Sequence, residues 1–120
     1  MINKIDINGV HMEVGDDLRK YVLKKISRLE KYVPRQARES VHIEIKLKEG
    51  KSRDKNARTC EVIMHLPHDS ITIAETTINM FAAVDIVEQK LKTQLRRYKE
   101  RHTDPTLHQR LMLRLKRSTA

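Results

Sequence analysis

Two amphipathic helical patterns on either side of a strand-like region limit most strongly how this chain can fold. Within residues 16–33 and again within 79–101, apolar residues recur every three or four positions, so each segment is predicted to be a helix with one buried stripe. Asp16 and Asp17 place carboxylates where the dipole of the first helix is positive, and Pro34 is expected to end it. The stripes consist of Leu18, Val22, Ile26, Leu29 and Val33, and of Met80, Val84, Val87, Leu91, Leu95 and Tyr98.

Between the two helices, apolar and polar residues alternate. The alternation predicts strands over 41–48, 59–66 and 70–76, each with one buried face. A short first strand is predicted over 4–7, after which Gly9 ends or bends it, and a second alternating stretch leads into the first helix. Residues 49–56 contain Gly50 and no apolar residue, and are expected to form an exposed loop.

The order of these elements predicts an α+β fold in one domain. A strand, a helix and a second strand imply a parallel pair with a right-handed crossover, and the last three strands form an antiparallel meander. The expected result is a β-α-β-β-β-α chain with a four-stranded mixed sheet and both helices on one face. We expect residues 1–102 to form this domain and residues 103–120 a basic C-terminal tail. Two readings of the tail stay open, namely a short packed helix and a segment that orders on a partner.

Positive charge is spread over the whole chain and indicates a polyanionic partner. The 120 residues include 25 Lys or Arg and 16 Asp or Glu, for a net charge of +9. The segments 16–33, 48–58, 79–101 and 103–120 each carry an excess of three positive charges. Aromatic residues make up only 3%, which argues against single-strand binding by base stacking. Structured RNA is therefore the favoured partner, bound along basic edges made by Lys25, Arg28 and Lys31 and by Lys90, Arg97 and Arg101.

No catalytic constellation is visible, so we expect a protein that is not an enzyme and has no cofactor, metal or small-molecule substrate. Cys60 is the only cysteine, alternates with core residues and is expected to be buried. His65 and His68, with Asp69 beside them, lie at a predicted turn and could suggest a metal site. No third strong ligand accompanies the two histidines. No secretory signal or run of roughly 18 apolar residues is present. We therefore expect a cytoplasmic protein with no membrane partner.

From about residue 2 to residue 102, the chain resembles the ribosome hibernation promoting factor and ribosome-associated inhibitor family, also labelled sigma-factor modulation proteins. The second helix carries the more specific part of the likeness, because a small Ala82-Ala83 pair and Asp85 open a long basic helix. The residues that carry the resemblance are Gly9-Val10-His11-Met12-Glu13-Val14, Leu18-Arg19-Lys20-Tyr21-Val22, Leu29-Glu30-Lys31-Tyr32, Asn79-Met80-Phe81-Ala82-Ala83-Val84-Asp85, Lys90-Leu91 and Gln94-Leu95-Arg96-Arg97-Tyr98-Lys99.

The resemblance implies a fold related in shape to double-stranded RNA-binding domains. It also implies a translation inhibitor that binds the small ribosomal subunit, in the channel used by mRNA and tRNA, through contacts of both helices with ribosomal RNA. By position, these RNA contacts fall on Lys25, Arg28 and Lys31 in the first helix and on Lys90 and Arg97 in the second. Further basic candidates in the second helix are Arg96, Lys99 and Arg101.

Three positions depart from the family pattern. Thr93 stands where Arg is frequent, which removes one phosphate contact that Arg96 and Arg101 can replace, while Asn79 and Phe81 stand for the more usual Asp and Tyr. The chain is expected to be a short-type member or the N-terminal domain of a long type, and its basic tail favours the hibernation-promoting type. The alternatives are a general double-stranded RNA-binding module and a protein that modulates a transcription factor.

Overall fold

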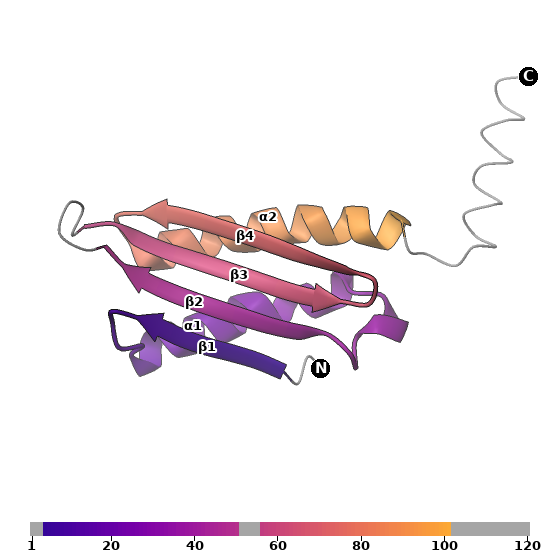
Figure 1. Ribbon diagram of the computed structural model, residues 1–120, viewed down its shortest axis with the longest axis horizontal. Coiled ribbons are helices and arrows are strands. Elements are labelled where there is room, and N and C mark those ends of the chain that lie inside the picture. The colour runs from indigo at the N-terminus through magenta and orange to yellow at the C-terminus, as the bar shows by residue number, and fades with distance from the viewer. Residues whose placement is uncertain (1–3, 51–55, 102–120) are drawn as a thin grey trace, which may run out of the picture.

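The predicted strand and helix order is confirmed in the computed structural model, which describes residues 4–50 and 56–101 (Figure 1). Two 3-10 helices, η1 and η2, follow the first α-helix and were not predicted. In chain order the elements are β1 (Lys4–Val10), α1 (Asp16–Ser27), η1 (Arg28–Tyr32), η2 (Arg35–Ala37), β2 (His42–Glu49), β3 (Arg58–Leu66), β4 (Asp69–Thr77) and α2 (Met80–Arg101). The expected tail, 103–120, and most of the expected loop, 51–55, lie outside the described residues.

The four strands form one mixed sheet in the order β1-β2-β3-β4. β1 and β2 are parallel, whereas β2–β3 and β3–β4 are antiparallel, as predicted. In Figure 1 both α-helices lie behind the sheet, so one face is covered and the other is open. The register places Ile45 beside Ile7 on one side and beside Val62 on the other, which continues one apolar row across three strands.

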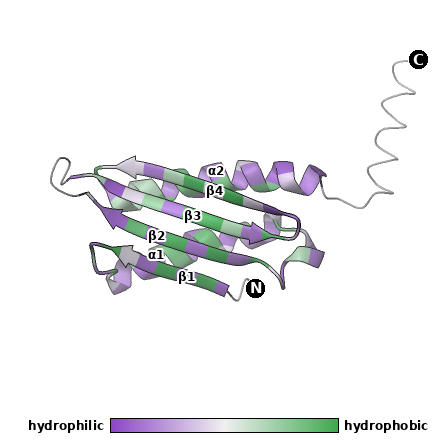
Figure 2. Cartoon of the chain, in the orientation of Figure 1, coloured by the Kyte–Doolittle hydropathy of each residue, from purple (hydrophilic) through white to green (hydrophobic). Residues whose placement is uncertain are grey.

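The core lies between the covered face of the sheet and the two helices. Alternate residues of the strands are buried there, and the alternation is visible as green and purple bands in Figure 2. Ile43, Ile45 and Leu47 of β2 are fully buried, as are Cys60, Val62 and Met64 of β3. From the helices, Val22, Ile26, Val84, Val87, Leu91 and Leu95 are fully buried. The apolar stripes read from the sequence are therefore the surfaces that the helices bury.

The first helix is shorter than predicted. The pattern over 16–33 predicts one α-helix, but the α-helix ends at Ser27 and the chain continues as the 3-10 helix η1. The backbone N–H of Val33 bonds to the carbonyl of Glu30 at 3.0 Å, an i→i+3 bond that tightens the last turn. Pro34 forces Val33 out of the helical region, to φ −88° and ψ 129°. Leu29 and Val33 stay buried in either geometry, so the apolar spacing alone does not distinguish the two helix types.

The chain turns sharply between β1 and α1, where the sequence predicts renewed alternation. β1 runs on to Val10, and His11 then adopts a left-handed φ of 59°. Met12 and Val14 pack against the core from this irregular segment and not from a strand. A side chain at Gly9 would lie 2.3 Å from the carbonyl oxygen of Met12, so the turn requires a residue without Cβ at this position.

α2 begins one residue later than predicted because Asn79 is its cap. The Asn79 side-chain oxygen accepts a hydrogen bond of 2.9 Å from the backbone N–H of Phe81. Tyr98, near the other end, donates its hydroxyl to the carbonyl of Pro67 at 2.9 Å and anchors the helix to the β3–β4 turn. Within residues 4–50 and 56–101, no helix has the length and apolarity that a membrane crossing requires.

Candidate nucleic-acid interface

The two basic helices lie side by side and are joined by contacts between the second half of α1 and the first turns of α2. The hydroxyl of Tyr21 in α1 donates a hydrogen bond of 2.5 Å to Oδ1 of Asp85 in α2. Nζ of Lys25 lies 3.5 Å from the same carboxylate oxygen, and the Tyr21 ring meets Phe81 edge-on at 5.0 Å. The hydrogen bond to Asp85 raises the pKa of Tyr21 to about 12. These contacts fix the position of one basic helix against the other.

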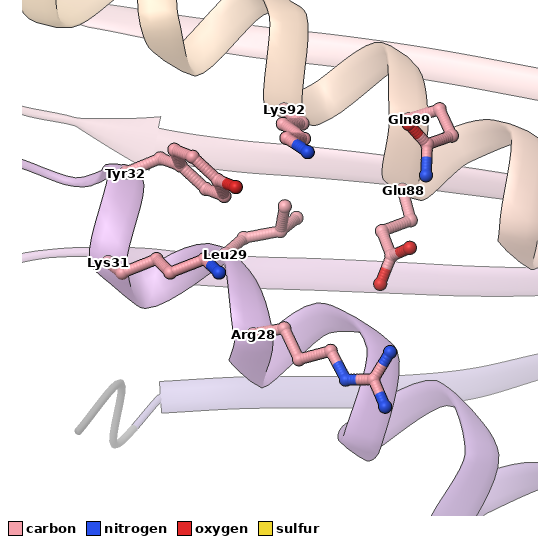
Figure 3. Close-up of a pocket in the computed structure, with 7 residues that line it drawn as sticks. All are labelled: Arg28, Leu29, Lys31, Tyr32, Glu88, Gln89 and Lys92. Atoms are coloured by element: carbon pink, nitrogen blue, oxygen red, sulfur yellow. The ribbon is translucent and has the colours of Figure 1, made fainter.

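One turn further along, η1 and α2 enclose a hollow of about 200 Å³. Figure 3 shows its lining, with Arg28 and Lys31 on η1 facing Glu88 and Lys92 on α2. We call this the η1–α2 hollow. Its full lining is Arg28, Leu29, Lys31, Tyr32, Glu88, Gln89 and Lys92.

Tyr32 gathers three cations at one end of the hollow. Nζ of Lys31 and Nζ of Lys92 lie 5.2 and 5.4 Å from the centre of its ring, and the guanidinium carbon of Arg96 lies 5.5 Å from it. A cation over the face of an aromatic ring is attracted by the ring's quadrupole. The interaction with the Lys92 ammonium lowers the pKa of Tyr32 below its usual value. The ring therefore holds like charges together that would otherwise repel one another.

Most of the predicted RNA contacts have no acidic partner among the described residues. Among the predicted contacts, Lys25, Lys90 and Arg101 form ion pairs within 4.0 Å. In the described part of the chain, no carboxylate lies within that distance of the remaining predicted cations, which are Arg28, Lys31, Arg96, Arg97 and Lys99. Charges that are concentrated and not neutralised internally favour an anionic ligand.

The other edge of α2 faces β4 and not α1. Lys90 forms a close ion pair with Glu75 of β4, and Arg101 bonds to Asp69 at 3.4 Å between Nη2 and Oδ2. Arg97 and Lys90 help to line a second, shallower depression of about 340 Å³ over β4. α2 therefore carries two basic edges, one on each side of its buried stripe.

The predicted contacts consequently divide into two groups. Arg28, Lys31 and Arg96 lie around the η1–α2 hollow, with Lys25 at the helix junction, while Lys90, Arg97 and Arg101 lie on the β4 side. Lys99 is exposed in the last turns of α2. The sequence reasoning missed Lys92 and Tyr32. The spacing of Lys92, Arg96 and Lys99, at i, i+4 and i+7, was a signal for a second basic edge.

The weaker chemical candidates lie elsewhere. Cys60 is buried, as predicted, and burial raises the pKa of its thiol to about 12. His65 lies on the open face of the sheet, where its Nε2 is 2.8 Å from Glu44 Oε2. The His65 hydrogen bond lowers the pKa of Glu44. The described residues contain no cluster of three or more His, Cys, Asp or Glu placed to hold a metal ion.

Comparison with known proteins confirms the family resemblance. A family model described as "Sigma 54 modulation protein / S30EA ribosomal protein" matches residues 5–103. The ribosome hibernation promotion factor of Lactococcus lactis subsp. cremoris is 32% identical over 98 residues, which are 82% of this chain and 50% of that protein. The ribosome hibernation promoting factor of Pseudomonas putida is 29% identical over 98 residues and is covered to 88%. The chain spans about half the length of the first of these and of the Staphylococcus aureus factor.

Two solved structures share the fold. The Thermus thermophilus Protein Y N-terminal domain superposes with a TM-score of 0.68 at 25% identity, over 79% of this chain and 98% of that one. A ribosomal subunit interface protein from Coxiella burnetii gives a TM-score of 0.66 at 26% identity, over 80% and 97%. The predicted α+β class with two helices on a four-stranded mixed sheet is thus found in these neighbours as well.

Proposed function

Because the chain belongs to the Sigma 54 modulation protein / S30EA ribosomal protein family, we propose that it is a ribosome hibernation factor. It binds the small ribosomal subunit through ribosomal RNA, lies in the channel for mRNA and tRNA, and blocks translation. The single observation that best supports this proposal is the group of cations around the η1–α2 hollow. They come from two helices and lie close together. Among the residues that the structure describes, no carboxylate lies within 4.0 Å of them.

The proposed RNA contacts occupy both edges of α2, the end of α1 and η1. On the η1 side they are Lys25, Arg28, Lys31 and Arg96, to which we add Lys92. On the β4 side they are Lys90, Arg97 and Arg101, while Lys99 continues the Lys92–Arg96 edge near the end of the helix. An RNA segment on each side would meet a row of positive charge, while the buried stripe between the rows stays in the core.

Binding would be driven mainly by release of counterions from RNA. If about six phosphates are neutralised, log affinity falls with log salt concentration with a slope of roughly −4 to −5. Inhibition would then be steric, because a packed domain in the channel excludes mRNA and tRNA. The Tyr21–Asp85 hydrogen bond and the apolar contacts beneath it hold the two helices as one body. No step of this mechanism requires a bond to be made or broken, a cofactor or a metal ion.

Residues 1–102 would form the ribosome-binding domain, and we propose that 103–120 is a basic tail that adds charge to it. The proposal places the protein in the cytoplasm, where ribosomes translate.

Sedimentation of the purified protein with purified ribosomal subunits, at low and high salt, tests the proposal. We expect salt-sensitive co-migration with the small subunit and competition by mRNA and tRNA. The double variant Arg28→Gln/Lys31→Gln should bind more weakly. The variant Lys4→Gln/Lys46→Gln loses the same charge from the open face of the sheet and should bind normally.

Three outcomes would contradict the proposal. The first is failure to co-migrate at low salt. The second is displacement by any long RNA duplex but not by mRNA or tRNA, which would indicate a general double-stranded RNA binder. The third is capture of an acidic protein partner in the absence of RNA, which would indicate a modulator of another factor.

A further inference from the structure

Glu88 is the one acidic residue that lines the η1–α2 hollow, and it is the exception within a basic surface. Glu88 is only 8% exposed, and its Oε2 atom, with less than 1 Å² of accessible surface, has no hydrogen-bond partner in the described structure. Leaving a buried charged acceptor without a partner costs more than the roughly 1–3 kcal/mol of a neutral one. An unpaired acceptor in a cavity therefore points to a ligand that supplies the donor.

The neighbouring cations do not satisfy Glu88. Arg28, Lys31 and Lys92 line the same hollow, but none lies within 4.0 Å of a Glu88 oxygen. In Figure 3 the Glu88 carboxylate extends from α2 into the space between the helices, while the Lys92 ammonium lies near the Tyr32 ring. The hollow therefore presents a free acceptor and free positive charge side by side.

This combination restricts the ligand. A carboxylate only accepts hydrogen bonds, so a phosphate group cannot satisfy Glu88 and would be repelled by it. An ammonium ion or a basic side chain would satisfy Glu88 but would be repelled by Arg28, Lys31 and Lys92. A ligand that carries N–H donors and a negative charge at different ends satisfies both halves of the hollow. In RNA, a single nucleotide has this character.

We propose that the η1–α2 hollow receives one unpaired nucleotide of the bound RNA, whose base donates hydrogen bonds to Glu88 while its phosphates lie against Lys31 and Lys92. Guanine is the preferred base, because its Watson–Crick edge offers two adjacent N–H donors to one carboxylate. Binding requires the Glu88 side chain to turn so that both oxygens face the hollow, since Oε2 has less than 1 Å² of accessible surface. That edge is occupied in a duplex, so the nucleotide must lie in a loop, bulge or junction. The inference rests on the proposed function and adds to it a site that reads a base.

The hollow suits this role in size and in lining. A volume of about 200 Å³ accommodates a group the size of a base but not a double helix. The Tyr32 ring already contacts Lys31, Lys92 and Arg96, so it holds cations in place and is not a free platform for stacking. Base selection would consequently depend on hydrogen bonds to Glu88 rather than on an aromatic surface.

The test measures binding of the full chain to four fluorescent RNA hairpins, which differ only in having G, A, C or U at one loop position, and to a blunt RNA duplex. We expect the G hairpin to bind about tenfold more tightly than the others, which corresponds to the lower part of the range for one good bidentate base contact. Glu88→Gln, which replaces one acceptor oxygen by a donor, should abolish this preference. Removing a negative charge from a basic surface should also strengthen binding of the duplex.

Two further variants separate a base contact from a general effect of charge. Glu88→Asp keeps the charge but shortens the side chain, so the preference for G should fall without tighter duplex binding. Glu13→Gln removes an exposed carboxylate outside the hollow and should leave the preference unchanged. Thermal unfolding of each variant checks that the fold is intact.

Equal affinity for the four hairpins, or a preference for G that survives in Glu88→Gln, would overturn the inference while leaving the proposed function standing. Failure of the wild-type chain to bind small subunits in the sedimentation experiment would instead overturn the proposed function, and the nucleotide site with it.

Discussion

Tyr21 and Asp85 connect the two basic helices through a hydrogen bond of 2.5 Å, although 64 residues separate them in the sequence. Lys25 shares the same carboxylate at 3.5 Å. The bond lies at the start of α2, one to two turns before Glu88 and Lys92. It therefore sets the position of η1 relative to α2 and, with it, the width of the η1–α2 hollow.

Removing this bond should destabilise the protein moderately. Tyr21→Phe deletes the hydroxyl donor and should lower the free energy of unfolding in urea by about 1 kcal/mol, because the acceptor is charged but half exposed. Asp85→Asn should cost more, since it also removes the ion pair with Lys25. In the double variant the two effects should be clearly less than additive. Full additivity would show that the two side chains do not interact in solution.

The three tyrosines should ionise in a fixed order as the pH rises. Tyr32 should ionise first, because the Lys92 ammonium lowers its pKa, and Tyr21 last, with a pKa of about 12. Burial raises the pKa of Tyr98 as well. Ultraviolet absorbance of the phenolate, recorded for the wild type and for Tyr21→Phe and Tyr32→Phe, assigns the steps. Loss of the earliest step in Tyr21→Phe would contradict the order.

The raised pKa of Tyr21 also makes the stability of the protein depend on pH. The folded-state pKa of Tyr21 is raised above its ordinary value of 10.0, so the protonated phenol is favoured in the folded state. Its contribution should be complete below about pH 10 and should be lost as the pH rises towards 12. The difference in unfolding free energy between wild type and Tyr21→Phe should therefore shrink over this window.

The turn after β1 should not tolerate a side chain at Gly9. In Gly9→Ala the new Cβ would lie 2.3 Å from the Met12 carbonyl oxygen, which is backbone and cannot rotate away. We expect a loss of about 1–3 kcal/mol in the free energy of unfolding. Gly15→Ala is the matched control, because no atom lies within 4 Å of its added Cβ. Equal losses in the two variants would show that the close approach at Gly9 is relieved at no cost.

The fold could be predicted from the sequence because its signals are periodic and local. The alternation in β2 and the stripe from Met80 to Tyr98 each identify one buried face, and each is buried as predicted. The end of α1 could not be predicted with the same accuracy, because Leu29 and Val33 are compatible with both an α-helix and a 3-10 helix. The choice depends on the bond from Val33 to Glu30 and on Pro34.

The candidate site was predicted only in part, because it depends on side chains that meet across elements. Lys90, Arg97 and Arg101 share one edge of α2 and were found from their spacing alone. The spacing of Lys92 to Arg96 and Lys99 was a signal in the sequence, but its position beside Tyr32 of η1 depends on the fold. In the sequence Glu88 is one of several acidic residues of a basic helix. Its burial follows from the packing of η1 against α2.

Lys92 should matter more for RNA binding than Lys90, although only Lys90 stood out in the sequence. Lys92 shares the Tyr32 ring with two other cations and has no carboxylate within 4.0 Å among the described residues. Lys90 must give up part of its ion pair with Glu75 before it can neutralise a phosphate. We expect Lys92→Gln to weaken binding to purified small subunits several-fold and to reduce the salt slope by about 1. Lys90→Gln should have a smaller effect on both.

Affinity measured at four or more salt concentrations separates the two variants. A change in the slope of log affinity against log salt reports a change in the number of phosphate contacts, whereas an equal loss of affinity at every salt concentration reports the loss of another kind of contact. Glu75→Gln supplies the matched control. It frees Lys90 without adding a cation, so it should strengthen binding if the ion pair is what limits Lys90. An unchanged affinity in Glu75→Gln, together with equal losses in Lys92→Gln and Lys90→Gln, would show that both edges of α2 act as one uniform charge and that pairing within the protein does not rank its contacts.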